Sequence, residues 1–171
     1  KELGDVLKTA DWSSAPELGK RMENALVFHV TFENGTSGQL DVPGTVFGDN
    51  VTGASQRVGL RIAHQLLPDK DIKSLIRAAA RGDIPGDGLD PEDLFRRLAT
   101  ALGCDVADLT IILCVDAVHE AGGKPYGAQI GDKGSPMRCV VSALSNLLRS
   151  SGKQSNPFCF VCLSATSDEA F

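Results

Sequence analysis

One acidic side chain stands at the end of the most apolar segment of this chain. Residues 109–115 read Leu-Thr-Ile-Ile-Leu-Cys-Val, and Asp116 follows them directly. A run so rich in β-branched residues is typical of a strand buried on both faces, as in a parallel sheet covered by helices. Such sheets bind ligands at the carboxyl ends of their strands, and nucleotide hydrolases use an acid there to hold Mg²⁺. Asp116 is therefore a candidate magnesium ligand, or else it only caps a turn.

Hydroxyl side chains follow the last apolar segment, residues 158–163. Ser164, Thr166 and Ser167 come directly after it. If this strand lies beside the one that ends at Asp116, these hydroxyl groups are placed to contact a γ-phosphate. Capping of the turn that ends the strand is an equal alternative for them.

Two arginines and one histidine are further candidates. Arg57 and Arg61 are four residues apart in an expected helix, so they share one of its faces. Their guanidinium groups suit phosphate oxygens or a partner's carboxylates, but we expect this face to be solvated. His29 alternates with Val27 and Thr31 along an expected strand, and we expect it to be a hydrogen-bonded histidine of the core.

Composition excludes several classes of function. The chain has 171 residues, of which 42% are hydrophobic and 23% are charged, as in one ordinary globular domain. A net charge of −5 offers no basic surface for nucleic acid. No apolar run is long enough to span a membrane as a helix. Because the first residue is Lys1 and not Met, we expect the chain to be part of a longer protein.

The five cysteines are expected to be free thiols. Their number is odd and their spacing matches no disulfide framework. Cys159 and Cys162 have the spacing of a metal-binding or redox pair, but they lie in an expected strand. Residues three apart in a strand point to opposite faces, so these two sulfurs share neither a metal nor a bond.

Helical and strand patterns alternate along the chain. The patterns predict strands at 26–32, 109–116 and 158–163, helices at 15–22, 54–67, 71–81, 91–102 and 135–150, and glycine-rich loops at 36–53 and 121–134. Apolar strands separated by helices predict an α/β fold, a three-layer αβα sandwich with a mostly parallel sheet. Because such sheets usually have about five strands, we expect this sheet to be incomplete.

Four segments resemble the NTPase module of Crinkler-type effectors, which oomycetes and some fungi secrete and to which modules of trypanosomatid retrotransposon-hot-spot proteins are related. The segments are residues 27–36 (Val-Phe-His-Val-Thr-Phe-Glu-Asn-Gly-Thr), 59–62 (Gly-Leu-Arg-Ile), 111–116 (Ile-Ile-Leu-Cys-Val-Asp) and 160–164 (Phe-Val-Cys-Leu-Ser). The resemblance covers most of the chain, and its first and third segments are the specific ones.

The resemblance implies a degenerate P-loop NTPase-like fold for residues 1–171, as a single domain that lacks the Walker A loop. Asp116 would end a Walker B strand and hold Mg²⁺ with ATP. Ser164 and Thr166 would follow the neighbouring sensor strand, and Arg61 would contact the nucleotide. The resemblance also implies a secreted protein that acts in a host cell, in the nucleus, on a host protein.

The chain departs from the pattern of this family in two places. No G-x-x-x-x-G-K-[ST] motif is present, and we expect that loop just before Lys1. Ala117 occupies the position where such strands usually have a glutamate that orients the attacking water. The nearest acid is Glu120, which would act as the base only if one helical turn followed Asp116. Without the phosphate-binding loop, we expect that this chain alone does not hydrolyse ATP.

Two hypotheses therefore remain open. The first is an ATPase-like effector domain, in which Asp116 and Mg²⁺ support ATP hydrolysis in a longer parent protein. The second is a non-catalytic module that keeps the NTPase fold and binds a host protein. Ala117 and the absent loop favour the second hypothesis for this chain, whereas the resemblance favours the first for the parent protein.

Overall fold

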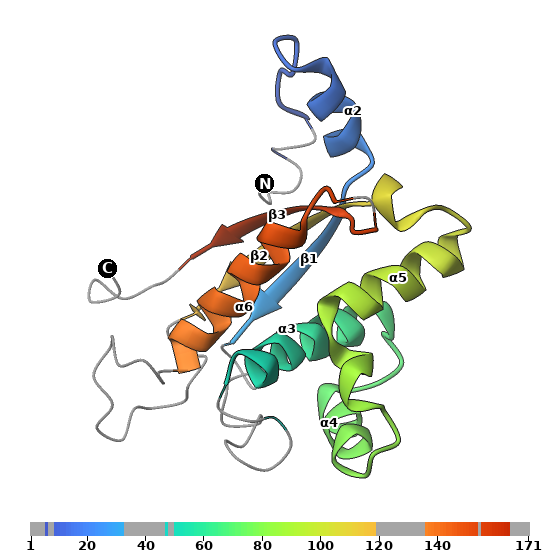
Figure 1. Ribbon diagram of the computed structural model, residues 1–171, viewed down its shortest axis with the longest axis vertical. Coiled ribbons are helices and arrows are strands. Elements are labelled where there is room, and N and C mark those ends of the chain that lie inside the picture. The colour runs from blue at the N-terminus through green and yellow to red at the C-terminus, as the bar shows by residue number, and fades with distance from the viewer. Residues whose placement is uncertain are drawn as a thin grey trace.

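Three parallel strands form the centre of the molecule in the computed structural model (Figure 1). The structure describes residues 6, 9–32, 47, 50–118, 136–153 and 155–164. The strands are β1 (Leu26–Thr31), β2 (Thr110–Asp116) and β3 (Phe158–Leu163), and they lie in the order β1-β2-β3. Both neighbouring pairs are parallel, so all three strands end at the same edge of the sheet. The predicted α/β fold with a parallel sheet is confirmed.

Helices occupy most of the remaining described residues. They are α2 (Pro16–Glu23), α3 (Val51–Leu66), α4 (Ile72–Ala80), α5 (Pro91–Leu102) and α6 (Pro136–Ser150), with short 3-10 helices η1 (Gly86–Leu89) and η2 (Val106–Asp108). The helix α3 begins at Val51, within the stretch predicted as loop, because Asn50 caps it: the Asn50 side chain accepts a hydrogen bond of 2.8 Å from the backbone N–H of Gly53.

One face of the sheet carries the main hydrophobic core. Alternate side chains of the three strands are buried there against α3, α5 and α6; they include Phe28, Val30, Ile111, Leu113, Val115 and Cys159. Phe95 of α5 packs on Phe28, with ring centroids 6.1 Å apart. The order of the strands explains this one-sided layer. When strands follow one another across a parallel sheet, connections of the same hand all fall on the same face.

The opposite face is covered at its amino end by α2. Met22 and Ala25 pack there on Ile112, which is fully buried. On the same face, Phe160 of β3 lies beside Ile112 and is 39% exposed, and His29 of β1 is exposed too. The prediction of a core histidine at position 29 was therefore wrong. The alternation of β1 does turn His29 to a face of the sheet, but no helix among the described residues buries it there.

Side chains of α3 seal the outer edge of β1. The Gln65 side chain accepts a hydrogen bond from the His29 backbone N–H and donates one to the His29 carbonyl oxygen, both at 2.9 Å. The Arg61 Nε donates to the Thr31 carbonyl oxygen at 2.8 Å. An edge strand whose backbone groups are taken up in this way does not offer a template to another strand.

Gly59 permits the close approach of α3 to η1. A Cβ atom at position 59 would lie 1.7 Å from the carbonyl oxygen of Leu89, a contact that only a backbone shift relieves. We expect Gly59→Ala to lower the free energy of unfolding by about 3 kcal/mol or more, measured by urea denaturation. Thr52→Ala, at an exposed position of the same helix, should change it by less than about 0.5 kcal/mol. Equal effects of the two substitutions would contradict this packing.

Candidate functional site

The carboxyl ends of the three strands bring polar side chains together. Thr31 of β1 is the register partner of Asp116 of β2. Ser164 follows β3, and its backbone N–H donates to the Val115 carbonyl oxygen at 2.9 Å. The Ser164 hydroxyl donates a hydrogen bond to Oδ1 of Asp116. Two residues 48 positions apart in the chain are thus in contact, and both are exposed at the surface, where a ligand can reach them.

The backbone after Asp116 takes an unusual conformation. Ala117 has a φ of 53°, in the left-handed region that residues with a Cβ rarely adopt. It is fully buried, and its backbone N–H donates to Oδ1 of Asp116 at 2.8 Å. Backbone strain of this kind persists where the surrounding structure imposes it, often at functional sites. This conformation was not predicted from the sequence, in which Ala117 stood out only as a missing glutamate.

Asp116 keeps one oxygen for a ligand. Its Oδ1 accepts from both the Ala117 N–H and the Ser164 hydroxyl. Across the described part of the chain, no hydrogen bond or ion pair involves its Oδ2. An exposed, oriented carboxylate oxygen suits a hard cation such as Mg²⁺, which proteins often hold through one or two carboxylates together with waters and the phosphates of a nucleotide.

Other predicted site residues are not part of this arrangement. Glu120 and Thr166, the predicted base and the second phosphate-binding hydroxyl, lie outside the described residues, so their roles stay predictions. In the described ranges, no three side chains of His, Cys, Asp or Glu form a group that holds a metal ion. The described part of the site therefore supplies a single carboxylate to a cation.

Arg61 is a structural residue and not a solvated one. Besides the bond to Thr31, its Nη1 donates to the Arg57 carbonyl oxygen at 3.0 Å, and its guanidinium lies 4.2 Å from the centre of the Phe32 ring. The side chain is only 3% exposed. The prediction of a solvated arginine face was wrong because α3 lays this face against the edge of β1. Helical spacing alone does not show that a strand edge lies there.

Arg57 is also buried, but its side chain is poorly satisfied. It is 1% exposed, and its Nε and Nη2 have no hydrogen-bond partner among the described residues. Gln65 contacts His29, and Arg61, one turn earlier in α3, contacts Thr31, so α3 runs antiparallel to β1. Arg57 is one further turn earlier and therefore lies about 5.4 Å nearer the carboxyl end of the sheet than Arg61. Burial of a guanidinium without a counter-charge costs several kcal/mol. A phosphate or carboxylate is the group that would offset this cost.

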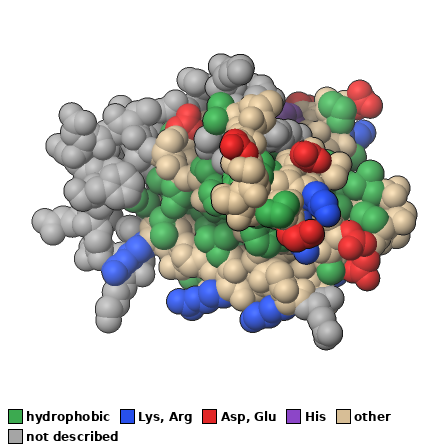
Figure 2. All heavy atoms as spheres, turned by 90° about the horizontal axis from the view of Figure 1, so that it is seen from above, with side chains coloured by type: hydrophobic (Ala, Val, Ile, Leu, Met, Phe, Trp, Pro, Cys, Tyr) green, Lys and Arg blue, Asp and Glu red, His purple; other side chains and the backbone are tan. Residues whose placement is uncertain are grey.

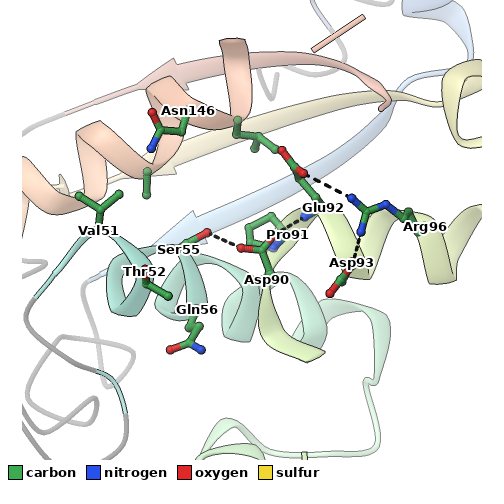
Figure 3. A pocket seen from close by; sticks show the side chains of 12 residues that line it. Val51, Thr52, Ser55, Gln56, Asp90, Pro91, Glu92, Asp93, Arg96 and Asn146 are labelled. Carbon is green, nitrogen blue, oxygen red and sulfur yellow. Dashed lines mark hydrogen bonds and ion pairs between the residues drawn. The ribbon is translucent and has the colours of Figure 1, made fainter. Parts of the chain in front are cut away.

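A groove lies elsewhere, between α3, α5 and α6 (Figure 3). It has a volume of about 630 Å³. Its acids are already paired: Ser55 donates to Asp90 at 3.1 Å, and Arg96 lies between Glu92 and Asp93, as Figure 3 shows. None of the residues that line this groove comes from the carboxyl ends of the strands. Its size therefore does not make it the better candidate for a nucleotide.

Charged side chains are mixed on the surface. In Figure 2, Lys and Arg side chains lie apart from one another on the face shown, with Asp and Glu side chains among them, and they form no continuous basic surface on that face. This agrees with the net charge of −5. None of the described helices is both long and apolar enough to cross a membrane.

Comparisons with known proteins leave the sequence resemblance as it stands. No protein-family model, no curated protein and no solved structure matches this chain. The likeness to the Crinkler-type module thus stays a prediction, which rests on the four segments in which it was found. The polar side chains at the carboxyl edge of the sheet are the feature of the described residues that indicates a ligand site.

The state of Arg57 is open to a stability measurement. Arg57→Met replaces a buried, unpaired charge with an apolar side chain of similar length. We expect the free energy of unfolding without ligand to rise by about 1 kcal/mol or more, as measured by urea denaturation. Arg97→Met, the same substitution at an exposed position of α5, should leave it within about 0.5 kcal/mol. A clear loss of stability in Arg57→Met would mean that this side chain has a partner in the folded protein.

Proposed function

We propose that this chain is a degenerate P-loop ATPase-like domain that binds the phosphates of ATP together with Mg²⁺ at the carboxyl edge of its sheet. The contact between Asp116 and Ser164 carries this proposal. An acid at the end of the central strand and a hydroxyl from the end of its neighbour are the two groups that a metal-bound triphosphate would meet there. The αβα arrangement of the P-loop class is part of the same proposal.

In this function, Asp116 holds the cation through Oδ2. The two hydrogen bonds to Oδ1 keep the carboxylate in one orientation, so little of its freedom is lost when the cation binds. The Ser164 hydroxyl can turn from the carboxylate to a phosphate oxygen, since a hydroxyl group both donates and accepts. Thr166 extends this set, and Glu120 acts as the base if hydrolysis occurs.

Positive charge comes from α3. Two donors of Arg57 have no partner among the described residues, and its place in α3 is toward the carboxyl end of the sheet, so we assign it to the anion in place of Arg61. Arg61 positions the helix instead, because its donors are used on Thr31 and Arg57. This division of roles is not apparent in the sequence, where Arg57 and Arg61 lie on the same face of one expected helix.

Turnover belongs to a longer parent protein in this proposal. The 171 residues contain no phosphate-binding loop of the Walker type, so binding without hydrolysis is the activity proposed for this chain. Secretion, action in a host cell and its nucleus, and a host protein as partner follow only from the resemblance to Crinkler-type effectors, and we propose them on that basis.

A non-catalytic interaction module is the second candidate. Ala117 occupies the position of the water-orienting glutamate. In addition, Phe160 and Leu163 of β3 are 39% and 45% exposed, although large apolar side chains on a strand are usually buried. Both observations suit a domain that keeps the fold and binds another protein.

Titration of the chain with ATP and Mg²⁺ tests the first candidate. We expect weak, magnesium-dependent binding by calorimetry, and Asp116→Asn should weaken it by about tenfold or more, because a neutral amide attracts the cation less. Asp105→Asn is the matched control, since Asp105 is an exposed acid near the amino end of β2 and should not change the affinity.

Two results would overturn the nucleotide proposal. One is equal affinity of Asp116→Asn and the unmodified chain. The other is the absence of any heat of binding at millimolar ATP while circular dichroism shows the native fold. Either result would leave the interaction module as the better description of this chain.

A further inference from the structure

The outer edge of β3 differs from the outer edge of β1. Phe158 donates its N–H to the Leu109 carbonyl oxygen, and Ser164 donates to that of Val115, at 3.0 and 2.9 Å. In a parallel ladder the residues that face the neighbouring strand alternate. The N–H and C=O groups of the residues between them, Cys159, Val161 and Leu163, therefore point away from β2 to the outer edge.

Among the described residues, Cys159 has a partner at that edge and the other two have none. The Cys159 N–H donates to the Ser151 hydroxyl at 2.7 Å, and the same hydroxyl lies 3.5 Å from the Cys159 carbonyl oxygen. For Val161 and Leu163, no hydrogen bond at the outer edge exists within the described residues. Figure 1 shows β3 as the border strand on this side of the sheet. The free edge is thus two residues long and is limited at one end by Ser151.

Exposed apolar side chains surround this edge. Phe160 and Leu163 are 39% and 45% exposed on β3, and Leu148 of α6 is 42% exposed. Helical periodicity places Val141 and Leu148 on the side of α6 away from Asn146, which faces the groove next to α3. Three of the large exposed apolar side chains of the described chain therefore border one strand edge. Phe160 lies on the face of Ile112, and Leu163 lies on the face of Cys159, so exposed apolar side chains border this edge on both faces of the sheet. Grouped exposed apolar side chains are typical of interaction surfaces.

We infer that this edge pairs with a second copy of the chain. The two β3 strands would run antiparallel across a two-fold axis, with Val161 opposite Leu163 of the other copy and Leu163 opposite its Val161. Each such pair exchanges two hydrogen bonds, so all four free backbone groups of each copy would be used. The axis then passes between the two Cys162 residues.

The composition of the edge favours a second copy over another partner. Residues 157–164 carry no charge, so two copies meet there without the repulsion that a net charge of −5 creates elsewhere. They also contain none of the lysines or inward-pointing charges that protect free edges. Because Ser151 already binds the Cys159 N–H, pairing of Val161 with Leu163 is the two-fold register that uses both positions of each copy. The sheet would become six-stranded, with α6 of each copy on the same face and their Val141 and Leu148 side chains adjacent.

Matched leucine substitutions test the interface in solution. We expect the chain to show a monomer–dimer equilibrium in sedimentation velocity, concentration-dependent because so short an edge buries little area. Leu163→Lys should raise the dissociation constant by about tenfold or more, since it places a cation beside an apolar cross-strand neighbour. Leu102→Lys adds the same charge at a residue of α5 that is 57% exposed, and it should leave the equilibrium unchanged.

Cross-linking tests the register independently. Two residues opposite each other at a non-hydrogen-bonded position have Cα atoms about 4.5 Å apart, within the range of a disulfide. Mild oxidation with copper phenanthroline removes two electrons and two protons from the two Cys162 thiols, and oxygen accepts them. Burial raises the pKa of Cys162, so less thiolate forms at neutral pH and the reaction should quicken as the pH rises.

The outcomes separate this dimer from its alternatives. A disulfide-linked dimer should form in the unmodified chain and in Cys104→Ser, which removes an exposed thiol, but not in Cys162→Ser. A chain that stays monomeric at millimolar concentration would overturn the inference, and the edge would then belong to a strand of a different protein. Equal effects of Leu163→Lys and Leu102→Lys, or cross-linking that persists in Cys162→Ser, would overturn it as well. None of these results depends on nucleotide binding.

Discussion

The shared direction of the three strands is the constraint on which the rest of the structure depends. Since β1, β2 and β3 are parallel and follow one another across the sheet, each connection must return along the length of the sheet. Connections of one hand place their helices on one face, which is where α3, α5 and α6 form the main core. The same direction brings Thr31, Asp116 and Ser164 to one edge, and the candidate site exists only because of it.

The two border strands of the sheet differ in how many of their outward backbone groups are hydrogen-bonded to side chains. At β1, Gln65 and Arg61 of α3 take up the outward backbone groups of His29 and Thr31. At β3, within the part of the chain that the structure describes, Ser151 does this for Cys159 and no side chain does it for Val161 or Leu163. A sheet with one sealed border can extend in one direction only. The open border and the carboxyl edge meet at Ser164, so the proposed interface and the proposed ligand site are neighbours without sharing a side chain.

The buried arginines of α3 connect the helix layer to the proposed ligand site. Arg57 and Arg61 are both enclosed by the packing of α3, but only Arg61 is compensated by carbonyl oxygens and an aromatic ring. The positive φ of Ala117 is a second unfavourable feature besides the buried charge of Arg57, and Ala117 directly follows Asp116. Unfavourable local features of this kind, backbone strain above all, are typical of functional sites. Both features lie toward the carboxyl side of the sheet, whereas the acids of the groove between α3, α5 and α6 are already paired.

The sequence by itself determined the three strands and the order of the helices, because apolar periodicity acts over a few neighbouring residues. It also pointed to Asp116 at a strand end. Only the tertiary structure decided that Ser164 reaches Asp116, that Arg57 and Arg61 are buried while His29 is exposed, and that Ala117 is left-handed. The physical reason is that these features depend on which strand lies beside which and on which face each helix covers. Such contacts join residues far apart in the chain, and a pattern of neighbouring residues does not contain them.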